Sequence, residues 1–287
     1  MNLIRHFVKR HPVLSYYALT FLISFGGILL IVGGPAGIPG KAEQIDKLML
    51  PVMLALFAGP SAAGILITAL AYGRQGFRNL GSKITKWRVG ARWYAVALLT
   101  APILFFSVSM ALSLTSEKFL PSIMVTGDKL SLLIFGISYG FIGGGLLEEL
   151  GWTGFAVPSL RLHHTAFRTA LIVGILWGAW HFMVIFWMSD PNGEVPLLLL
   201  LPIQLFSWLP AYRILMVWVY ERTGGSLLLA MLMHAFLSSA MLICQPQVLG
   251  GYTLLTYILS FAAIIWILAL LVYFGDKKVF VRQGQVL

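Results

Sequence analysis

Two adjacent glutamates, Glu148 and Glu149, follow a long apolar and glycine-rich run, and no other acidic residue lies within such a run. Two of the 6 histidines, His181 and His234, are also set in apolar stretches. A carboxylate and imidazoles that share a confined, partly dry cavity can activate a water molecule for attack on a substrate. Neighbouring residues of a helix point about 100° apart, so one glutamate can face the cavity while the other bonds to a neighbouring side chain.

The composition of the chain shows whether these side chains belong to a water-soluble protein or to a membrane protein. Of the 287 residues, 59% are hydrophobic and only 10% are charged, and the mean hydropathy is +0.88. So little polar surface cannot cover a water-soluble globule of this size. The sequence therefore predicts an integral membrane protein, in which buried ionisable residues are costly and usually functional.

Long apolar segments set the expected architecture. A membrane-spanning helix needs about 20 mostly apolar residues, and the chain offers about eight such segments. We find no repeat and no linker, so the sequence predicts an all-α, polytopic helix bundle formed by a single domain over residues 1–287. The spans are expected near residues 13–34, 48–72, 93–115, 131–157, 168–189, 195–220, 226–244 and 252–275.

The basic residues orient this bundle. With both termini in the cytoplasm, only Lys41, Lys47, Lys118 and Lys129 fall on the outside, which is the orientation that the positive-inside rule favours. We expect a multi-pass protein of the cell (plasma) membrane, whose net charge of +10 reflects topology and anionic lipid and requires no nucleic acid partner. The basic segment 73–92 fits an interfacial helix and an ordinary loop equally well. The basic residues expected inside are Arg5, Lys9, Arg10, Arg74, Arg78, Lys83, Lys86, Arg88, Arg92, Arg161, Arg168, Arg213, Arg222, Lys277, Lys278 and Arg282.

The embedded ionisable side chains belong to three different spans. Counted from the expected cytoplasmic ends, Glu148, His181 and His234 lie about 15, 20 and 12 Å deep. Either histidine alone is equally well explained as an interhelical hydrogen-bonding residue. A common depth is what a polar site in the core of the bundle requires, so together these residues predict a shared site.

Three short motifs surround these side chains. EELGWTG begins at Glu148, WGAWH ends at His181, and HAFLS begins at His234. In this order they resemble the three motifs of the type II CAAX prenyl endopeptidase and bacteriocin-processing (CPBP, or Abi) family of intramembrane proteases, over a core of about residues 131–245. The resemblance implies an eight-helix intramembrane endopeptidase with Glu148 as its catalytic base and Glu149 as a supporting neighbour. It also implies that His181 helps to bind and activate the water and that His234 helps to form the oxyanion hole.

The sequence departs from the family pattern of Glu-Glu-x-x-x-Arg, Phe-x-x-x-His and His-x-x-x-Asn at three positions. Trp177 replaces the Phe, and we expect it to pack; Ser238 replaces the Asn and keeps a hydroxyl donor for the oxyanion. Thr153 replaces the Arg, so Glu149 needs another partner or a proton. Arg213, which lies inside the sixth span, is our candidate for that partner; the alternative is an arginine that extends to the cytoplasmic interface.

Other functions remain open. No cofactor is expected, but a zinc-dependent protease with His181, His234 and Glu148 as ligands is chemically reasonable, although the HExxH spacing is absent. A transporter or proton relay also uses intramembrane glutamates and histidines. A non-catalytic scaffold or immunity protein is favoured by Thr153 and Ser238. For a protease we expect membrane lipid as the surroundings, a peptide or lipidated protein as the substrate, and a substrate cavity that opens toward the cytoplasm.

Overall fold

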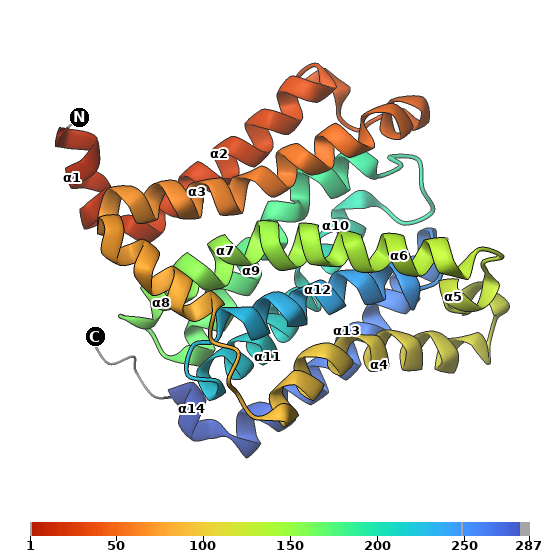
Figure 1. Cartoon of the computed structure of the whole chain (residues 1–287). Coiled ribbons are helices and arrows are strands. Elements are labelled where there is room, and N and C mark those ends of the chain that lie inside the picture. Colours follow the sequence, from red (N-terminus) through yellow and green to blue (C-terminus); the bar gives the residue numbers. More distant parts are fainter. Residues whose placement is uncertain (1, 248, 282–287) are drawn as a thin grey trace.

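The computed structural model describes residues 2–247 and 249–281 of the chain. Arg282, counted above among the inside basic residues, lies outside the described residues. Within these ranges the chain is helical and has no β-strand, and its helices form one bundle (Figure 1). The prediction of an all-α polytopic bundle is confirmed.

The helices and helical turns follow one another along the chain with short connections. They are α1 (Asn2–Arg10), α2 (Pro12–Val32), η1 (Pro35–Gly37), α3 (Ala42–Ile84), α4 (Ala91–Ser113), η2 (Glu117–Phe119), α5 (Ser122–Val125), α6 (Lys129–Tyr139), the π-helical η3 (Gly140–Glu148), α7 (Glu149–Gly151), the π-helical η4 (Trp152–Ala156), α8 (Val157–Arg161), α9 (Ala166–Met188), α10 (Leu197–Phe206), α11 (Leu209–Arg222), α12 (Leu227–Ile243), α13 (Gly251–Gly275) and α14 (Lys277–Val281).

Each expected span is found as helix, though not always at the expected length. Among the described residues, 7 helical stretches are long and apolar enough to cross a membrane. The eighth span, expected at 226–244, is the shorter apolar helix α12 of 17 residues. Because α12 packs against α4, α6, α11 and η3, it is surrounded by protein and need not match the thickness of the lipid.

The second span is longer than expected and bends. Helix α3 runs past residue 72 to Ile84, through Gly73 at φ 57° and ψ −142°. A positive φ is accessible to glycine at little cost, so the chain turns here and resumes a helix at once. For residues up to Ile84 the structure therefore has the helix that the basic segment 73–92 suggested, and an irregular connection follows as far as Gly90.

The sixth span is broken, although the sequence predicted one continuous helix over 195–220. Helix α10 ends at Phe206 and α11 begins at Leu209. Pro210 stands in the first turn of α11, the place where the missing N–H of proline does no harm and where it prevents the preceding helix from continuing. The break starts a new helix in the middle of the bundle, with Arg213 close to its beginning.

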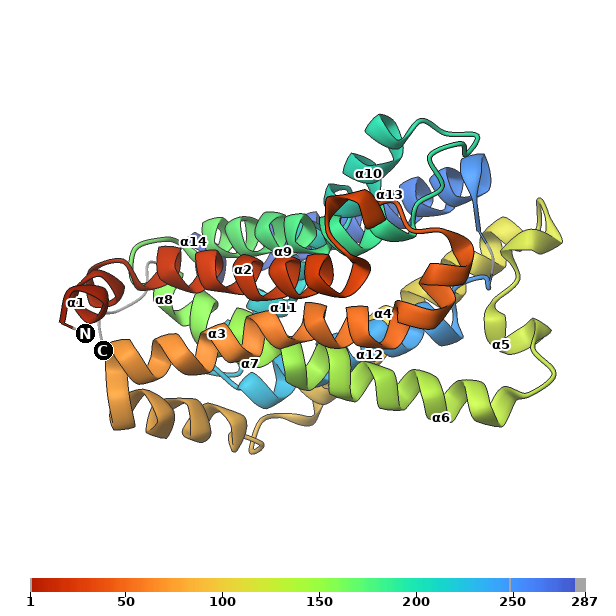
Figure 2. The same ribbon diagram turned by 90° about the horizontal axis from the view of Figure 1, so that it is seen from above.

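The first and last described helices, α1 and α14, lie at one end of the bundle. Both are on the left in two perpendicular views, and α5 is at the opposite end (Figures 1 and 2). An even number of crossings requires this arrangement. The placement of that end in the cytoplasm stays a prediction.

The π-helical turn η3 packs closely against α12 in the core. Its Gly140 lies against α12, where an added Cβ would overlap the carbonyl oxygen of Ala235 and the hydroxyl of Ser239. Only a residue without a side chain allows the two backbones to approach this closely. Wide turns of this kind are frequent at functional sites, and η3 ends at Glu148.

We expect Gly140→Ala to lower the stability of the protein, because a methyl group would be forced against the α12 backbone at a cost of about 1–3 kcal/mol. Gly26→Ala is the matched control, since a Cβ at Gly26 in α2 meets nothing within 4 Å and alanine is the better helix former. Thermal unfolding of the two variants in detergent would measure the difference. An unchanged midpoint for Gly140→Ala would contradict the close packing described here.

Candidate functional site

The carboxylate of Glu148 is buried and held from one side. Its side chain is 3% exposed, and its Oε2 accepts hydrogen bonds from Trp152 Nε1 at 3.1 Å and from Trp177 Nε1 at 2.8 Å. The other oxygen, Oε1, lies 3.8 Å from His234 Nε2, which is beyond hydrogen-bond length. One oxygen is thus fixed by two indoles, and the second faces the imidazole without a direct bond.

Glu149 lies in a different, fully enclosed environment. Arg213 Nη1 is 3.0 Å from its Oε1 and 3.1 Å from its Oε2, and both side chains are 0% exposed. The Thr153 hydroxyl donates to Oε2, and His234 Nδ1 lies 2.7 Å from Oε1. Because a carboxylate only accepts, His234 carries a proton on Nδ1 and directs Nε2 toward Glu148.

Arg213 is an interior residue, so its inclusion among the basic residues at the cytoplasmic ends is wrong, and it does not extend to an interface. Its guanidinium also stacks over the Trp177 ring at 4.4 Å, and Nη1 lies 3.5 Å from Thr153 Oγ1. A buried charge without a partner is strongly destabilising, whereas one that is paired and hydrogen-bonded is tolerated. The break before α11 is what brings the guanidinium to this depth.

His181 lies at the edge of this group. It is half-buried, and its Nδ1 is 2.9 Å from the carbonyl oxygen of Trp177. A carbonyl only accepts, so Nδ1 is the protonated nitrogen and Nε2 is left to accept or exchange a proton. Among the described residues, no hydrogen bond or ion pair joins His181 to either glutamate.

Ser238 and His234 point toward the same small gap. They lie one turn apart on α12, and a Cβ placed on Gly144 of η3 would contact the Ser238 hydroxyl and lie 3.0 Å from His234 Nε2. The glycine keeps the space in front of both polar groups open. The structure therefore brings together Glu148, Glu149, Thr153, Arg213, His234 and Ser238, with His181 beside them.

The site also contains two tryptophans, which the sequence alone did not assign to it. Trp177 was expected only to pack, yet its ring contacts the rings of both His181 and His234, at 5.7 and 4.9 Å between centroids. Trp152 stands one helical turn after Glu148. The sequence could have indicated both. A buried indole N–H needs an acceptor, and a residue at i+4 on a helix is within reach of a carboxylate.

The residues of the zinc alternative do not fit a metal as they stand. Among the described residues, no three His, Cys, Asp or Glu side chains converge on one point in the manner of metal ligands. His234 uses Nδ1 on Glu149, and two indole N–H groups occupy Glu148 Oε2. The described residues therefore form no three-ligand zinc site.

The cavities of the bundle lie on both sides of this site. One of about 510 Å³ opens at the α1/α14 end between α3, η4, α8 and α11, and Gly154 and Phe155 line it. That is the end from which a substrate was expected to enter, but no candidate catalytic residue lines this cavity. Two further cavities, of about 120 and 410 Å³, lie toward the opposite end.

Comparison with known proteins gives the site its family. Residues 129–240, which include all three motifs, match the family described as "Type II CAAX prenyl endopeptidase Rce1-like". The protein named CAAX prenyl protease 2 of Methanococcus maripaludis is 23% identical over 288 residues, covering 96% of this chain and 97% of the relative. Both matches support the CPBP family for this chain. Family and relative together indicate a membrane-embedded protease.

This chain departs from the CPBP pattern in the position of the positive charge that pairs with the second glutamate. The position four residues after the second glutamate, where the family has arginine, is Thr153, and its hydroxyl bonds to Glu149. The cation comes instead from Arg213, which is 64 residues away from Glu149 in sequence. The carboxylate is therefore paired, although the motif lacks its arginine.

We expect Arg213→Met to destabilise the protein by about 3–5 kcal/mol, because Glu149 would remain as an uncompensated buried charge. Adding Thr153→Arg to this variant returns the cation to the family position and should restore part of the loss. Arg168→Met, at an exposed position of α9, is the control for loss of a positive charge. Thermal unfolding in detergent, measured for all three, would disprove the pairing if Arg213→Met behaved like Arg168→Met.

Proposed function

We propose that this protein is an intramembrane endopeptidase in which Glu148 activates a water molecule with the help of His181. The observation that supports this most strongly is the asymmetry of Glu148. Two indole N–H groups fix its Oε2, and its Oε1 has no donor within hydrogen-bond length. A general base needs such a fixed carboxylate with a free oxygen for the proton that it removes.

The reaction then balances with groups that the chain supplies. A water bound between Glu148 Oε1 and His181 Nε2 attacks the carbonyl carbon of the scissile peptide as Glu148 takes one of its protons. The carbonyl oxygen becomes an oxyanion. When the tetrahedral intermediate collapses, the C–N bond breaks and Glu148 passes the proton to the leaving amine, which gives a carboxylic acid and an amine.

His234 and Ser238 stabilise the oxyanion by hydrogen bonding. Both face the gap at Gly144, and His234 donates from Nε2 when it is protonated on both nitrogens. Glu149, hydrogen-bonded to Nδ1 at 2.7 Å, stabilises that imidazolium and fixes the direction of the ring. Donors oriented in advance toward a developing charge are among the largest contributions to catalysis.

The substrate in this proposal is a peptide or a lipidated protein held at the membrane, and the enzyme acts in the cell membrane surrounded by lipid. Seven long apolar helices leave short loops and no soluble domain in the described chain, so the substrate is recognised within the bundle. Nucleic acid has no part in this function. No cofactor takes part in this reaction, and cleavage in the presence of a chelator tests zinc directly.

Cleavage of a library of membrane-tethered peptides by the purified protein tests the mechanism. We expect Glu148→Gln, His181→Ala and His234→Ala each to lose at least about 100-fold in kcat, which is the range of a general acid–base contribution. His163→Ala is the control, since His163 is exposed in the loop before α9, and it should cleave like wild type. A chelator should leave the rate unchanged.

Other outcomes would support the alternatives. Activity that is lost with chelator and restored by zinc would make the site a metal centre. Wild-type activity retained by Glu148→Gln would remove this residue from the mechanism. If the folded wild-type protein cut no peptide but moved protons across a vesicle membrane, or did neither and bound a partner, a proton relay or a scaffold would replace the peptidase.

A further inference from the structure

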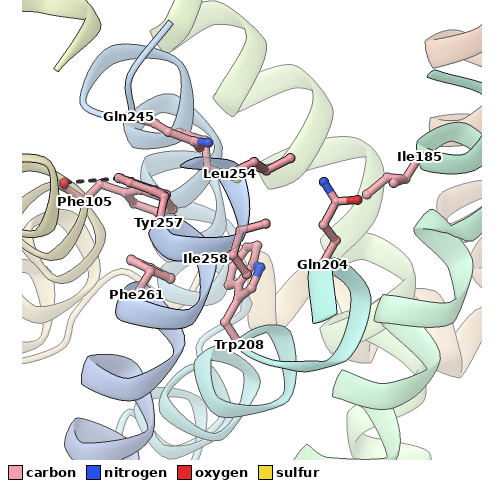
Figure 3. Close-up of a pocket in the computed structure, with 10 residues that line it drawn as sticks. Phe105, Ile185, Gln204, Trp208, Gln245, Leu254, Tyr257, Ile258 and Phe261 are labelled. Carbon is pink, nitrogen blue, oxygen red and sulfur yellow. Dashed lines mark hydrogen bonds between the residues drawn. The ribbon is translucent and has the colours of Figure 1, made fainter. Parts of the chain in front are cut away.

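A cavity follows the candidate catalytic site along the bundle, away from α1 and α14. It measures about 120 Å³ and is lined mainly by aromatic and aliphatic side chains of α4, α9, α10, α12 and α13 (Figure 3). A second cavity of about 410 Å³ continues from it and shares Ile185, Gln204 and Leu254 with the first. Neither has a role in the mechanism above.

Helical register connects these cavities to the catalytic histidines. On α9, Ile185 lies one turn beyond His181 on the same face. On α12, Met241 lies two turns beyond His234 and on its face. Residues at i, i+4 and i+7 of a helix share one side, so the two helices that carry the histidines also form two walls of the first cavity.

The floor of the first cavity touches the site. Trp208, at the break between α10 and α11, lines the cavity, and its ring centroid is 6.5 Å from that of Trp177. Trp177 in turn donates to Glu148. Two side chains, Trp208 and Trp177, would therefore separate a ligand in the cavity from the proposed base.

The size and polarity of the first cavity select its occupant. A cavity of about 150 Å³ holds one benzene molecule, so about 120 Å³ accommodates a single apolar side chain and not a long lipid chain. Gln204 faces Ile185 in this cavity (Figure 3), and its Oε1 is buried without a hydrogen-bond partner among the described residues. A carboxamide bonds equally well to the N–H and the C=O of a peptide unit.

The second cavity adds a charge preference. Asp190 and Glu194 line it, and none of its lining residues is lysine or arginine. Two exposed carboxylates at the mouth of an apolar cavity attract a positive charge. The combination of one apolar subsite, a peptide-binding carboxamide and an acidic mouth fits a short basic peptide segment.

We propose, on the basis of the endopeptidase function, that these cavities bind the substrate next to the cleaved bond. An apolar side chain occupies the cavity between Ile185 and Trp208, and its backbone amide bonds to Gln204. A lysine, an arginine or a free amino terminus lies at Asp190 and Glu194. The substrate class is thus a peptide with a large apolar residue and a positive charge close to it in the chain, which enters from the end opposite α1 and α14.

Binding to the cleavage-deficient Glu148→Gln protein tests this independently of activity. Four fluorescent, membrane-tethered peptides would combine Leu or Ala at the apolar position with Lys or Glu at the charged position. We expect the Leu–Lys peptide to bind at least tenfold tighter than the other three. A photoreactive group on its leucine should cross-link to Ile185, Trp208 or Met241.

Added to the Glu148→Gln protein, Ile185→Trp should fill the cavity and abolish the preference for Leu over Ala. Ile175→Trp on the same helix, at a side chain that is 50% exposed, should keep it. Gln204→Leu should weaken binding of both Leu and Ala peptides, and Asp190→Asn with Glu194→Gln should remove only the preference for Lys. Unchanged thermal unfolding would show that each variant is folded, and Gln204→Leu serves as the second test if the tryptophan does not fit.

Equal binding of all four peptides, or cross-links to Gly154 and Phe155 at the α1/α14 end, would overturn this proposal while the endopeptidase remained intact. Selective binding with the expected cross-links, but no cleavage by wild type, would support the binding site and reject the peptidase. Cleavage of the Leu–Lys peptide by wild type with unchanged KM in Ile185→Trp would reject the site alone.

Discussion

The paired charges of Glu149 and Arg213 are the constraint on which the rest of the site depends. Neither side chain is exposed, and in the interior of a membrane protein each would be prohibitively costly without the other. The pair joins α7 to α11 across the bundle and leaves Glu149 Oε1 as the acceptor for His234. The direction of the imidazole, and hence the group that faces Glu148, follows from where Arg213 lies.

Two irregularities of the backbone make this pairing geometrically available. Pro210 begins a fresh helix halfway through the sixth span, so Arg213 enters the core from the first turns of α11. The π-helical turn η3 carries Gly140 and Gly144 against α12, so His234 and Ser238 come up to the backbone that bears Glu148. A regular helix at either place would move one member of the group away from the others. The residues of the candidate site are thus held by the least regular parts of an otherwise regular fold.

The sequence allowed the spans and the histidines and glutamates of the site to be predicted, because the cost of burying charge in lipid is visible in composition alone. It did not reveal the break before Leu209, and it left open whether a helix follows residue 72 as far as Ile84, since local turns are decided by packing as much as by proline and glycine. It also missed Trp152 and Trp177 as donors to Glu148. An indole has both an apolar ring and one N–H, and only the fold shows which of them determines its position.

Thr153 is the residue that most favoured a protein without catalysis, and its surroundings weaken that interpretation. The position is not vacant: its hydroxyl bonds to Glu149, and Arg213 lies 3.5 Å from the same oxygen. The buried carboxylate of Glu149 requires a cation and enough hydrogen-bond donors nearby. It does not matter how far away in the sequence these groups are. The family motif is one way to meet these requirements, in which an arginine of the same helix supplies the cation. When another helix supplies the charge, the motif is lost while the electrostatic balance around Glu149 and His234 is kept, so the absent arginine is no evidence of an inactive site.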